Sequence, residues 1–305
     1  MAETRKRRWK ISAVIGTLPM IVVAVGVYVI GIAYTFYWSF TSSRLFPNNN
    51  LVGLSQYQRL WGDSRWQIAV QNIWIFGGLL IVFSLVFGYL LAVFMDQRIR
   101  QEDLFRSIFL YPFAMSLIVT GLIWQWMLDP NLGIENTLHS WGWASFHFTP
   151  LVDPNTAIYG LVVAGMWQGS GVTMAILLAG LRGIDAEIWK AAKVDGVPTW
   201  RVYLFIALPM IRGSLATAFV LQVVGVVRVY DLVVAMTGGG PGIATNMPAV
   251  YVIQMITSSQ NVGLGMAAAM MMLMPVVAVL ALVGIGNWIS ARRQAAANRR
   301  ELATA

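Results

Sequence analysis

Residues 69–95 read AVQNIWIFGGLLIVFSLVFGYLLAVFM, an apolar stretch without a single charged side chain. A helix needs about 20 consecutive apolar residues to cross the roughly 30 Å hydrocarbon core of a bilayer. Because this stretch is longer than that, it predicts a transmembrane helix rather than an element of a soluble core.

Five further apolar stretches are also long enough to cross a bilayer, at residues 11–40, 107–128, 156–181, 206–236 and 263–289. Of the 305 residues, 58% are hydrophobic and 11% are charged, against about 45–50% and 25% in a soluble domain. This balance excludes a water-soluble enzyme. The sequence therefore predicts an all-α polytopic transmembrane helical bundle of six helices. The first stretch exceeds the apolar region of a signal peptide and lacks a small-residue cleavage site, so we expect a retained helix.

The lysines and arginines gather in alternate segments. The rich segments contain Arg5, Lys6, Arg7, Arg8 and Lys10; Arg98, Arg100 and Arg106; Arg182, Lys190, Lys193, Arg201 and Arg212; and Arg292, Arg293, Arg299 and Arg300. The predicted outer segments hold only Arg44, Arg59 and Arg65, and Arg228 lies within the fifth apolar stretch. By the positive-inside rule, the rich segments and both termini are cytoplasmic. We therefore expect a basic N-terminus (1–10), a membrane domain (11–290) and a basic tail (291–305). Topology thus explains the net charge of +8, and no nucleic-acid partner is expected.

The predicted cytoplasmic loop 183–209, between the fourth and fifth helices, contains its own helix signals. Asp185 is a preferred N-cap, Glu187 places negative charge in the first turn, and Gly196 can adopt the left-handed conformation that ends a helix. Pro198 then favours the first turn of a second helix, which leads through Pro209 into the fifth span. The apolar face of the first helix consists of Ile188, Ala191 and Ala192.

Residues 190–196, KAAKVDG, followed by IALP at 206–209, resemble the Glu-Ala-Ala-x-x-Asp-Gly loop of binding-protein-dependent ATP-binding-cassette import permeases. The flanking sequences LAGL (178–181), Tyr230-Asp231 and TGGGP (237–241) are similar to the carbohydrate branch, the maltose-permease-like subunits. The chain departs from the motif at Lys190, which replaces the leading glutamate, and at Val197, which replaces an alanine. We expect an acidic or neutral residue of the ATPase opposite Lys190.

The resemblance implies a multi-pass permease subunit of the bacterial inner membrane that forms half of a solute pathway and catalyses no reaction. It implies as partners a second homologous permease, two cytoplasmic ATP-binding subunits, an extracytoplasmic solute-binding protein and membrane lipid. ATP and Mg²⁺ belong to the ATPase, and no cofactor is expected in this chain. The implied ATPase-coupling residues are Asp185, Glu187, Ile188, Lys190, Ala191, Ala192, Asp195, Gly196 and Pro209. Trp141, Gly239, Gly240 and Pro241 are expected to receive the binding protein.

Polar residues within the apolar stretches are candidates for the substrate path: Gln125, Gln168, Gln222, Arg228, Tyr230 and Asp231. Glutamines near aromatic rings suit sugar hydroxyls and ring faces, although each can equally bond between helices. Arg228 and Asp231, three residues apart, either pair on one helical face or line the path. We expect the transported solute to be a saccharide, a polyol, glycerol phosphate or an anionic sugar, and Arg228 favours an anionic one.

Other chemistry has little support in the sequence. The absence of cysteine excludes thiol and thiolate sites. His139 and His147 lie eight residues apart in an outer loop and indicate a surface role, so no metal site is expected, and Glu135 is taken as a solvated loop charge. The run 238–241 lacks the lysine of a nucleotide-binding loop. Two alternatives are an ion-gradient-driven secondary transporter, which needs mid-membrane carboxylates, and a membrane enzyme, which needs clustered acid, base or metal ligands.

Overall fold

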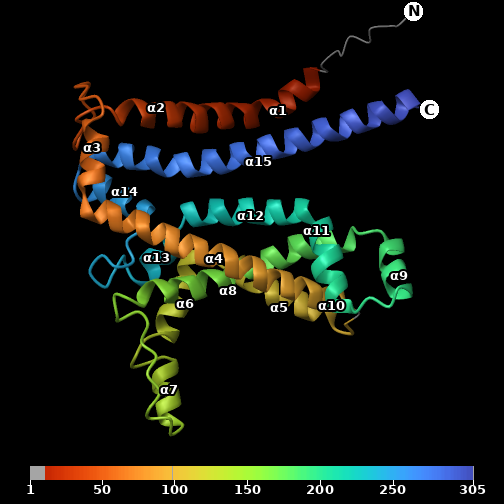
Figure 1. Cartoon of the computed structure of the whole chain (residues 1–305). Helices are drawn as coiled ribbons and strands as arrows, with labels where there is room; N and C mark the ends of the chain where they lie inside the picture. The colour runs from red at the N-terminus through yellow and green to blue at the C-terminus, as the bar shows by residue number, and fades with distance from the viewer. Residues whose placement is uncertain (1–10, 98, 305) are drawn as a thin grey trace, which may run out of the picture. The chain divides into compact units, whose positions relative to one another are not determined.

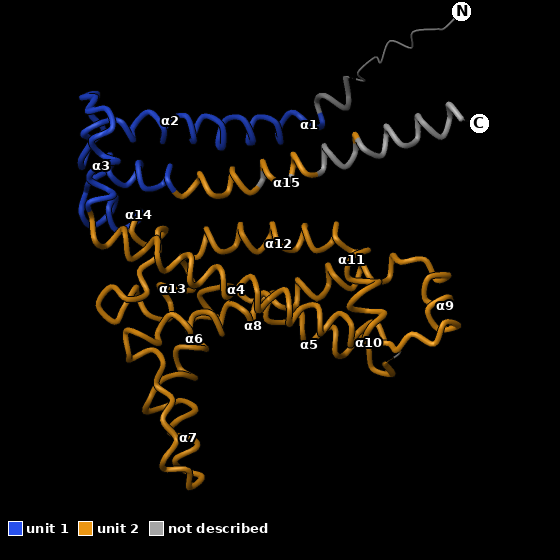
Figure 2. The backbone as a smooth tube through the Cα atoms, in the orientation of Figure 1, with its two compact units in different colours: residues 1–62, 252–271 blue, residues 63–251, 272–305 orange. Residues whose placement is uncertain are grey.

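The computed structural model describes residues 11–97 and 99–304, so the predicted basic segment 1–10 and Arg98 lie outside the described residues. Within these ranges the chain is almost entirely helical, and an isolated bridge between Thr41 and Leu51 stands in place of any sheet (Figure 1). The prediction of an all-α fold is confirmed. Two compact units make up the chain, residues 1–62 with 252–271 and residues 63–251 with 272–305 (Figure 2).

The first unit begins with one continuous helical run that matches the first predicted span: α1 (Ile11–Val23), the π-helical segment η1 (Ala24–Val29) and α2 (Ile30–Trp38). After α3 (Ser55–Gly62), the chain returns to this unit with the end of α14 (Pro248–Thr257) and the start of α15 (Val262–Thr304). The backbone N–H of Gly263 donates to the carbonyl of Ser43 at 2.8 Å, which ties the start of α15 to the loop after α2.

The second unit is built on three helices that pack against one another, α4 (Ser64–Asp96), α8 (Ala157–Arg182) and α12 (Arg212–Val227). Around them lie α5 (Glu102–Ala114), α6 (Leu117–Met127), α7 (Ile134–Ser140), α9 (Ala186–Val194), α10 (Thr199–Arg201), the π-helical η2 (Val202–Ala207), α11 (Leu208–Met210) and α13 (Asp231–Met236).

Glycines allow the helices of the second unit to approach closely. A Cβ atom at Gly88 on α4 would lie 2.6 Å from Cγ2 of Thr173 on α8. A Cβ atom at Gly171, also on α8, would overlap the backbone carbonyl of Phe109 on α5. Small residues at such crossings permit the van der Waals packing that holds membrane helices together.

Two predicted spans are bent rather than straight, which corrects the sequence interpretation. The stretch 107–128 divides into α5 and α6, which meet at 99°, and the stretch 206–236 bends by 74° between Met210 and Arg212. A proline precedes each bend, Pro112 in α5 and Pro209 in α11, and proline removes a backbone donor and clashes with the preceding turn. Within residues 11–97 and 99–304, four helices are long and apolar enough to cross a membrane, or up to six if each bent pair is one span.

Candidate functional site

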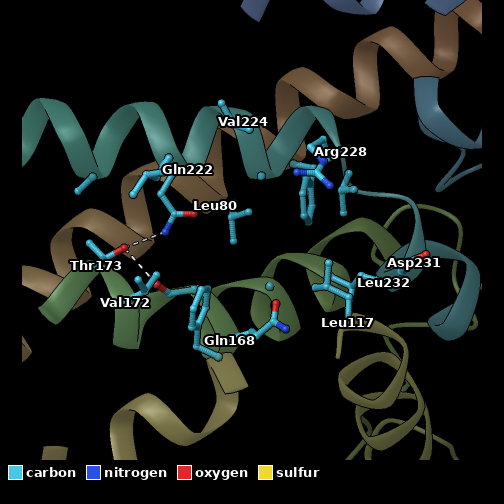
Figure 3. Close-up of a pocket in the computed structure, with 18 of the residues that line it drawn as sticks. Leu80, Leu117, Gln168, Val172, Thr173, Gln222, Val224, Arg228, Asp231 and Leu232 are labelled. Carbon is cyan, nitrogen blue, oxygen red and sulfur yellow. Dashed lines mark hydrogen bonds between the residues drawn. The ribbon is translucent and has the colours of Figure 1, made fainter. Parts of the chain in front are cut away.

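A cavity of about 430 Å³ lies between α4, α8 and α12 within the second unit (Figure 3). Most of its wall is apolar, with side chains such as Phe76 and Leu80. The polar lining residues are Gln168, Thr173, Gln222, Arg228 and Asp231. The structure therefore brings together four of the six residues predicted for the substrate path, and adds Thr173.

Gln222 projects from α12 toward α8 and is only 9% exposed. Its Nε2 donates a hydrogen bond of 2.9 Å to Oγ1 of Thr173, which itself donates to the carbonyl of Gly169 at 3.1 Å. A side chain at Gly169 would meet Nε2 of Gln222 at 3.1 Å, so glycine makes room for this contact. Thr173 lies 49 residues before Gln222, and no local pattern in the sequence links the two.

Gln168 forms a hydrogen bond at the bend between α5 and α6 and also lines the cavity. Its Nε2 donates to the carbonyl of Met115 at 3.1 Å, a group at the end of α5 where the helical bonding pattern stops. Gln168 is also one of the residues that line the cavity (Figure 3). Gln168 therefore has both of the roles that the sequence suggests for a glutamine, since it bonds between helices and lines the cavity.

Arg228 and Asp231 are separated by a break in the helix, so the prediction that they share one helical face is wrong. α12 ends at Val227 and α13 begins at Asp231, with Tyr230 between them outside regular helix. Among the described residues no ion pair joins Arg228 to Asp231. Irregular backbone at membrane depth is tolerated only where protein buries it or where it lines a cavity. This segment does line the cavity, through Arg228, Val229 and Asp231.

Two predicted path residues lie elsewhere, which corrects the sequence interpretation. Gln125 is exposed on α6, because the neighbouring Trp124 occupies the inward side and packs against Trp167 with ring centroids 5.9 Å apart. Tyr230 packs its ring against the apolar core instead of lining the cavity.

The helix predicted within loop 183–209 is present as α9. Oδ1 of Asp185 caps its first turn by accepting a 3.0 Å hydrogen bond from the backbone N–H of Glu187. Nζ of Lys190 donates to Oε1 of Glu187 at 2.9 Å, so the residue that replaces the motif's glutamate pairs within α9 itself. Both side chains are exposed, and such a pair adds little stability.

α9 ends in a Schellman motif, the turn expected of Gly196. The backbone N–H of Val197 donates to the carbonyl of Ala192 at 3.0 Å, and that of Gly196 donates to Lys193 at 3.3 Å. Gly196 has φ of +66°, a left-handed conformation that costs other residues roughly 1–2 kcal/mol. Asp195 occupies the C-cap just before this turn.

The predicted apolar face of α9 is divided between the interior and the surface. Ala192 is buried and Ile188 is half-buried, whereas Ala191 is exposed. The most exposed apolar side chain nearby is Val194, at 86%. Positions 187, 190, 191 and 194 share one helical side at i, i+3, i+4 and i+7 spacing, so Glu187, Lys190, Ala191 and Val194 form one exposed side of α9. Val194 was missing from the predicted set.

Aromatic and polar contacts tie α9 to the long helix α4. The ring of Trp189 packs against that of Tyr203 in η2, with centroids 5.2 Å apart. The Tyr203 hydroxyl donates to Oδ2 of Asp96, the last residue of α4, at 2.7 Å. The hydroxyl of Tyr89, also on α4, donates to the Tyr203 carbonyl at 2.7 Å. These contacts connect α9, through η2, to α4, which forms one wall of the cavity.

The outer-loop residues predicted to receive a partner differ in exposure. Trp141, directly after α7, is exposed. Gly239 is buried, because the Thr245 hydroxyl folds back to donate to the Gly240 carbonyl at 2.7 Å and closes the loop on itself. Gly239 is thus covered by its own chain, while Pro241 and Gly240 are half-buried, and the docking role of the three residues stays a prediction.

The structure combines helices long enough to span a bilayer, a cavity at a helix break, and a capped helix-turn-helix linked to that cavity. Together, these features define the class of a membrane permease. Residues 84–294 match the family model described as binding-protein-dependent transport system inner membrane component. The chain belongs to this family.

Individual relatives agree with this assignment. The chain is 34% identical to a probable ABC transporter permease of Pyrococcus horikoshii, over 85% of this chain and 90% of that protein. It is 31% identical to the xylose/arabinose import permease of Haloferax volcanii, over 72% and 70%. Its fold matches a crystal structure of a bacterial alginate ABC transporter in complex with a periplasmic protein bound to alginate pentasaccharide, with a TM-score of 0.76, 18% identity and coverage of 91% and 93%.

The family assignment confirms the resemblance found in the sequence. The chain is the membrane permease component of a binding-protein-dependent ABC transport system, and it is a transport subunit rather than an enzyme. The secondary-transporter alternative receives no support, since the relatives are ABC permeases.

Proposed function

We propose that this chain forms one half of the translocation pathway of a carbohydrate importer, and that the solute passes through the cavity between α4, α8 and α12. The observation that carries the proposal is the polar lining, with uncharged donors and acceptors from Gln168, Thr173 and Gln222 set in an apolar wall. Neutral amides and hydroxyls suit sugar hydroxyls. The xylose/arabinose permease and the alginate transporter, both similar to this chain, support a saccharide as the solute.

The proposed assembly has four kinds of component. A second homologous permease completes the pathway, two cytoplasmic subunits bind ATP and Mg²⁺, and an extracytoplasmic binding protein delivers the solute to the outer loops. α9 lies in a groove of an ATPase subunit, and the contacts of Trp189 and Tyr203 transmit the ATPase movement to α4. The cavity then opens alternately to the two sides of the membrane.

The proposed topology has six crossings, counting each bent pair as one. Segments 1–10, 183–209 and 291–305 are cytoplasmic, and 11–290 form the membrane domain. Because the chain contains no cysteine, single cysteines introduced at Lys193 and Asp153, both exposed, give a clean test. We expect a membrane-impermeant maleimide to label Asp153→Cys in intact cells and Lys193→Cys only after permeabilisation. The opposite labelling pattern would overturn the topology.

Gln222→Leu tests the cavity with little change in side-chain volume. The substitution removes the hydrogen bond to Thr173 and one polar group of the lining. Since a hydrogen-bonding group is worth about 1–1.5 kcal/mol, we expect solute uptake at low concentration to fall about tenfold. The measurement is the initial rate of uptake of radiolabelled saccharide by cells that express the assembled transporter.

Gln125→Leu is the matched control, because Gln125 is exposed on α6 outside the cavity. We expect it to leave uptake unchanged. Equal membrane levels of both variants, checked by immunoblot, exclude a folding defect. If the two variants lose the same fraction of uptake, the cavity is not the solute path.

A further inference from the structure

Three side chains that the sequence scatters over an outer segment converge beside α7. Glu135 and His139 lie one turn apart on α7, and His147 returns from the loop that follows. Nδ1 of His147 lies 3.3 Å and Nε2 of His139 lies 4.0 Å from Oε1 of Glu135. The three potential ligand atoms all lie within 4.8 Å of one another.

Glu135 is not the solvated loop charge that the sequence suggested, since the residue is only 8% exposed. Its Oε2 accepts a 2.9 Å hydrogen bond from the backbone N–H of Phe148. That hydrogen bond, helped by His147, holds the pKa of Glu135 below its usual range despite burial. Its Oε1 faces the imidazoles of His139 and His147.

The arrangement suits a tetrahedral divalent ion. Nitrogen and oxygen ligands about 2.0–2.1 Å from Zn²⁺ lie roughly 3.3–3.5 Å apart in tetrahedral geometry. The Glu135–His147 separation of 3.3 Å already matches this value, and the Glu135–His139 separation of 4.0 Å requires a shift of about half an ångström. Two histidines and one carboxylate form a ligand set that leaves the fourth position open to water.

One contact competes with the ion. Nε2 of His139 lies 2.6 Å from the carbonyl oxygen of Phe146, so in the metal-free form the ring donates a proton to that carbonyl. Binding through Nε2 requires the other neutral tautomer, in which the proton sits on Nδ1, because the metal takes the nitrogen lone pair. His147 is 78% exposed at its side chain, which gives the ion a route from solvent.

We propose that Glu135, His139 and His147 form a binding site for a divalent transition-metal ion, Zn²⁺ in preference to Mg²⁺ or Ca²⁺. Imidazole ligands favour Zn²⁺ over the two oxygen-preferring ions. The bound ion joins the two ends of the loop 139–147 and fixes it against α7. That loop carries the exposed rings of Trp141 and Trp143, so the ion orders an aromatic surface on the segment that projects from the helices in Figure 1.

The site is tested on the full chain, purified in detergent with an affinity tag that contains no histidine. Titration with Co²⁺ is expected to give the intense ligand-field absorption of four-coordinate cobalt, with one equivalent bound and displaced by Zn²⁺. Tryptophan fluorescence should change over the same titration, because Trp141 and Trp143 lie within the loop 139–147. Mg²⁺ at the same concentration is expected to displace none of the cobalt.

His147→Gln should weaken Zn²⁺ binding at least tenfold, given that losing even an outer-shell partner costs 10–100-fold. Because His147 is exposed, we do not expect its substitution to disturb the fold. Glu135→Gln should weaken Zn²⁺ binding to the same extent. Asp153→Asn, an exposed carboxylate of the same outer segment, is the matched control and should bind normally. Unchanged affinity in His147→Gln, or the weak absorption of six-coordinate cobalt in the unmodified chain, overturns the proposal.

Discussion

Gly171→Ala is expected to prevent the permease from packing its second unit correctly. The added methyl group would overlap the backbone carbonyl of Phe109, and no rotamer change can move a backbone atom aside. α5 and α8 must then separate along their contact, which removes van der Waals packing that membrane helices depend on. Overpacking of this kind typically costs about 1–3 kcal/mol and occasionally more. We expect a lower thermal midpoint and a smaller monodisperse peak in detergent size-exclusion chromatography.

Gly78→Ala on α4 is the matched control, since a Cβ atom there has no other atom within 4 Å. Replacing glycine by alanine inside a helix is intrinsically favourable by roughly 0.5–1 kcal/mol. The two variants should therefore shift the thermal midpoint in opposite directions. A Gly171→Ala protein as stable as the unmodified chain would show that α5 and α8 do not approach as closely as described.

The long apolar helices were predictable because crossing a bilayer imposes a length and a composition that any window of the sequence reveals. The bends were not. Pro19 and Pro275 lie inside the helices α1 and α15, whereas Pro112 and Pro209 precede sharp bends. A proline in a membrane helix is tolerated wherever neighbours satisfy the freed backbone groups. Gln168 does this at the carbonyl of Met115, and such a partner is invisible in local sequence.

The coupling loop was predictable in outline because its signals are local. Asp185 and Gly196 act on backbone atoms a few residues away, so spacing alone located both ends of α9. The direction of each side chain depends on what α9 packs against, and this explains why Ala192 is buried while Ala191 is exposed. The convergence of Glu135 and His147 likewise requires a loop to fold back on its helix.

The exposed side of α9 predicts a large effect from a single apolar residue. Val194 is 86% exposed and lies on the same side of α9 as the exposed Ala191, so its whole side chain is available to a partner. On the proposed function, this partner is the groove of the ATPase. Full burial of a valine side chain contributes about 1.5–3 kcal/mol, whereas flanking exposed charges such as Lys190 and Glu187 contribute little.

Val194→Asp should therefore abolish coupling while leaving the permease folded. Besides losing the apolar contact, the substitution buries an unpaired carboxylate, so we expect at least about 30-fold weaker binding of the ATPase. The measurement is co-purification of the ATPase with the tagged permease, together with ATPase stimulation in nanodiscs. Val194→Ile, which keeps the apolar surface, should retain both. If Val194→Asp still co-purifies the ATPase at the normal ratio, the side of α9 formed by Glu187, Lys190, Ala191 and Val194 is not the docking surface.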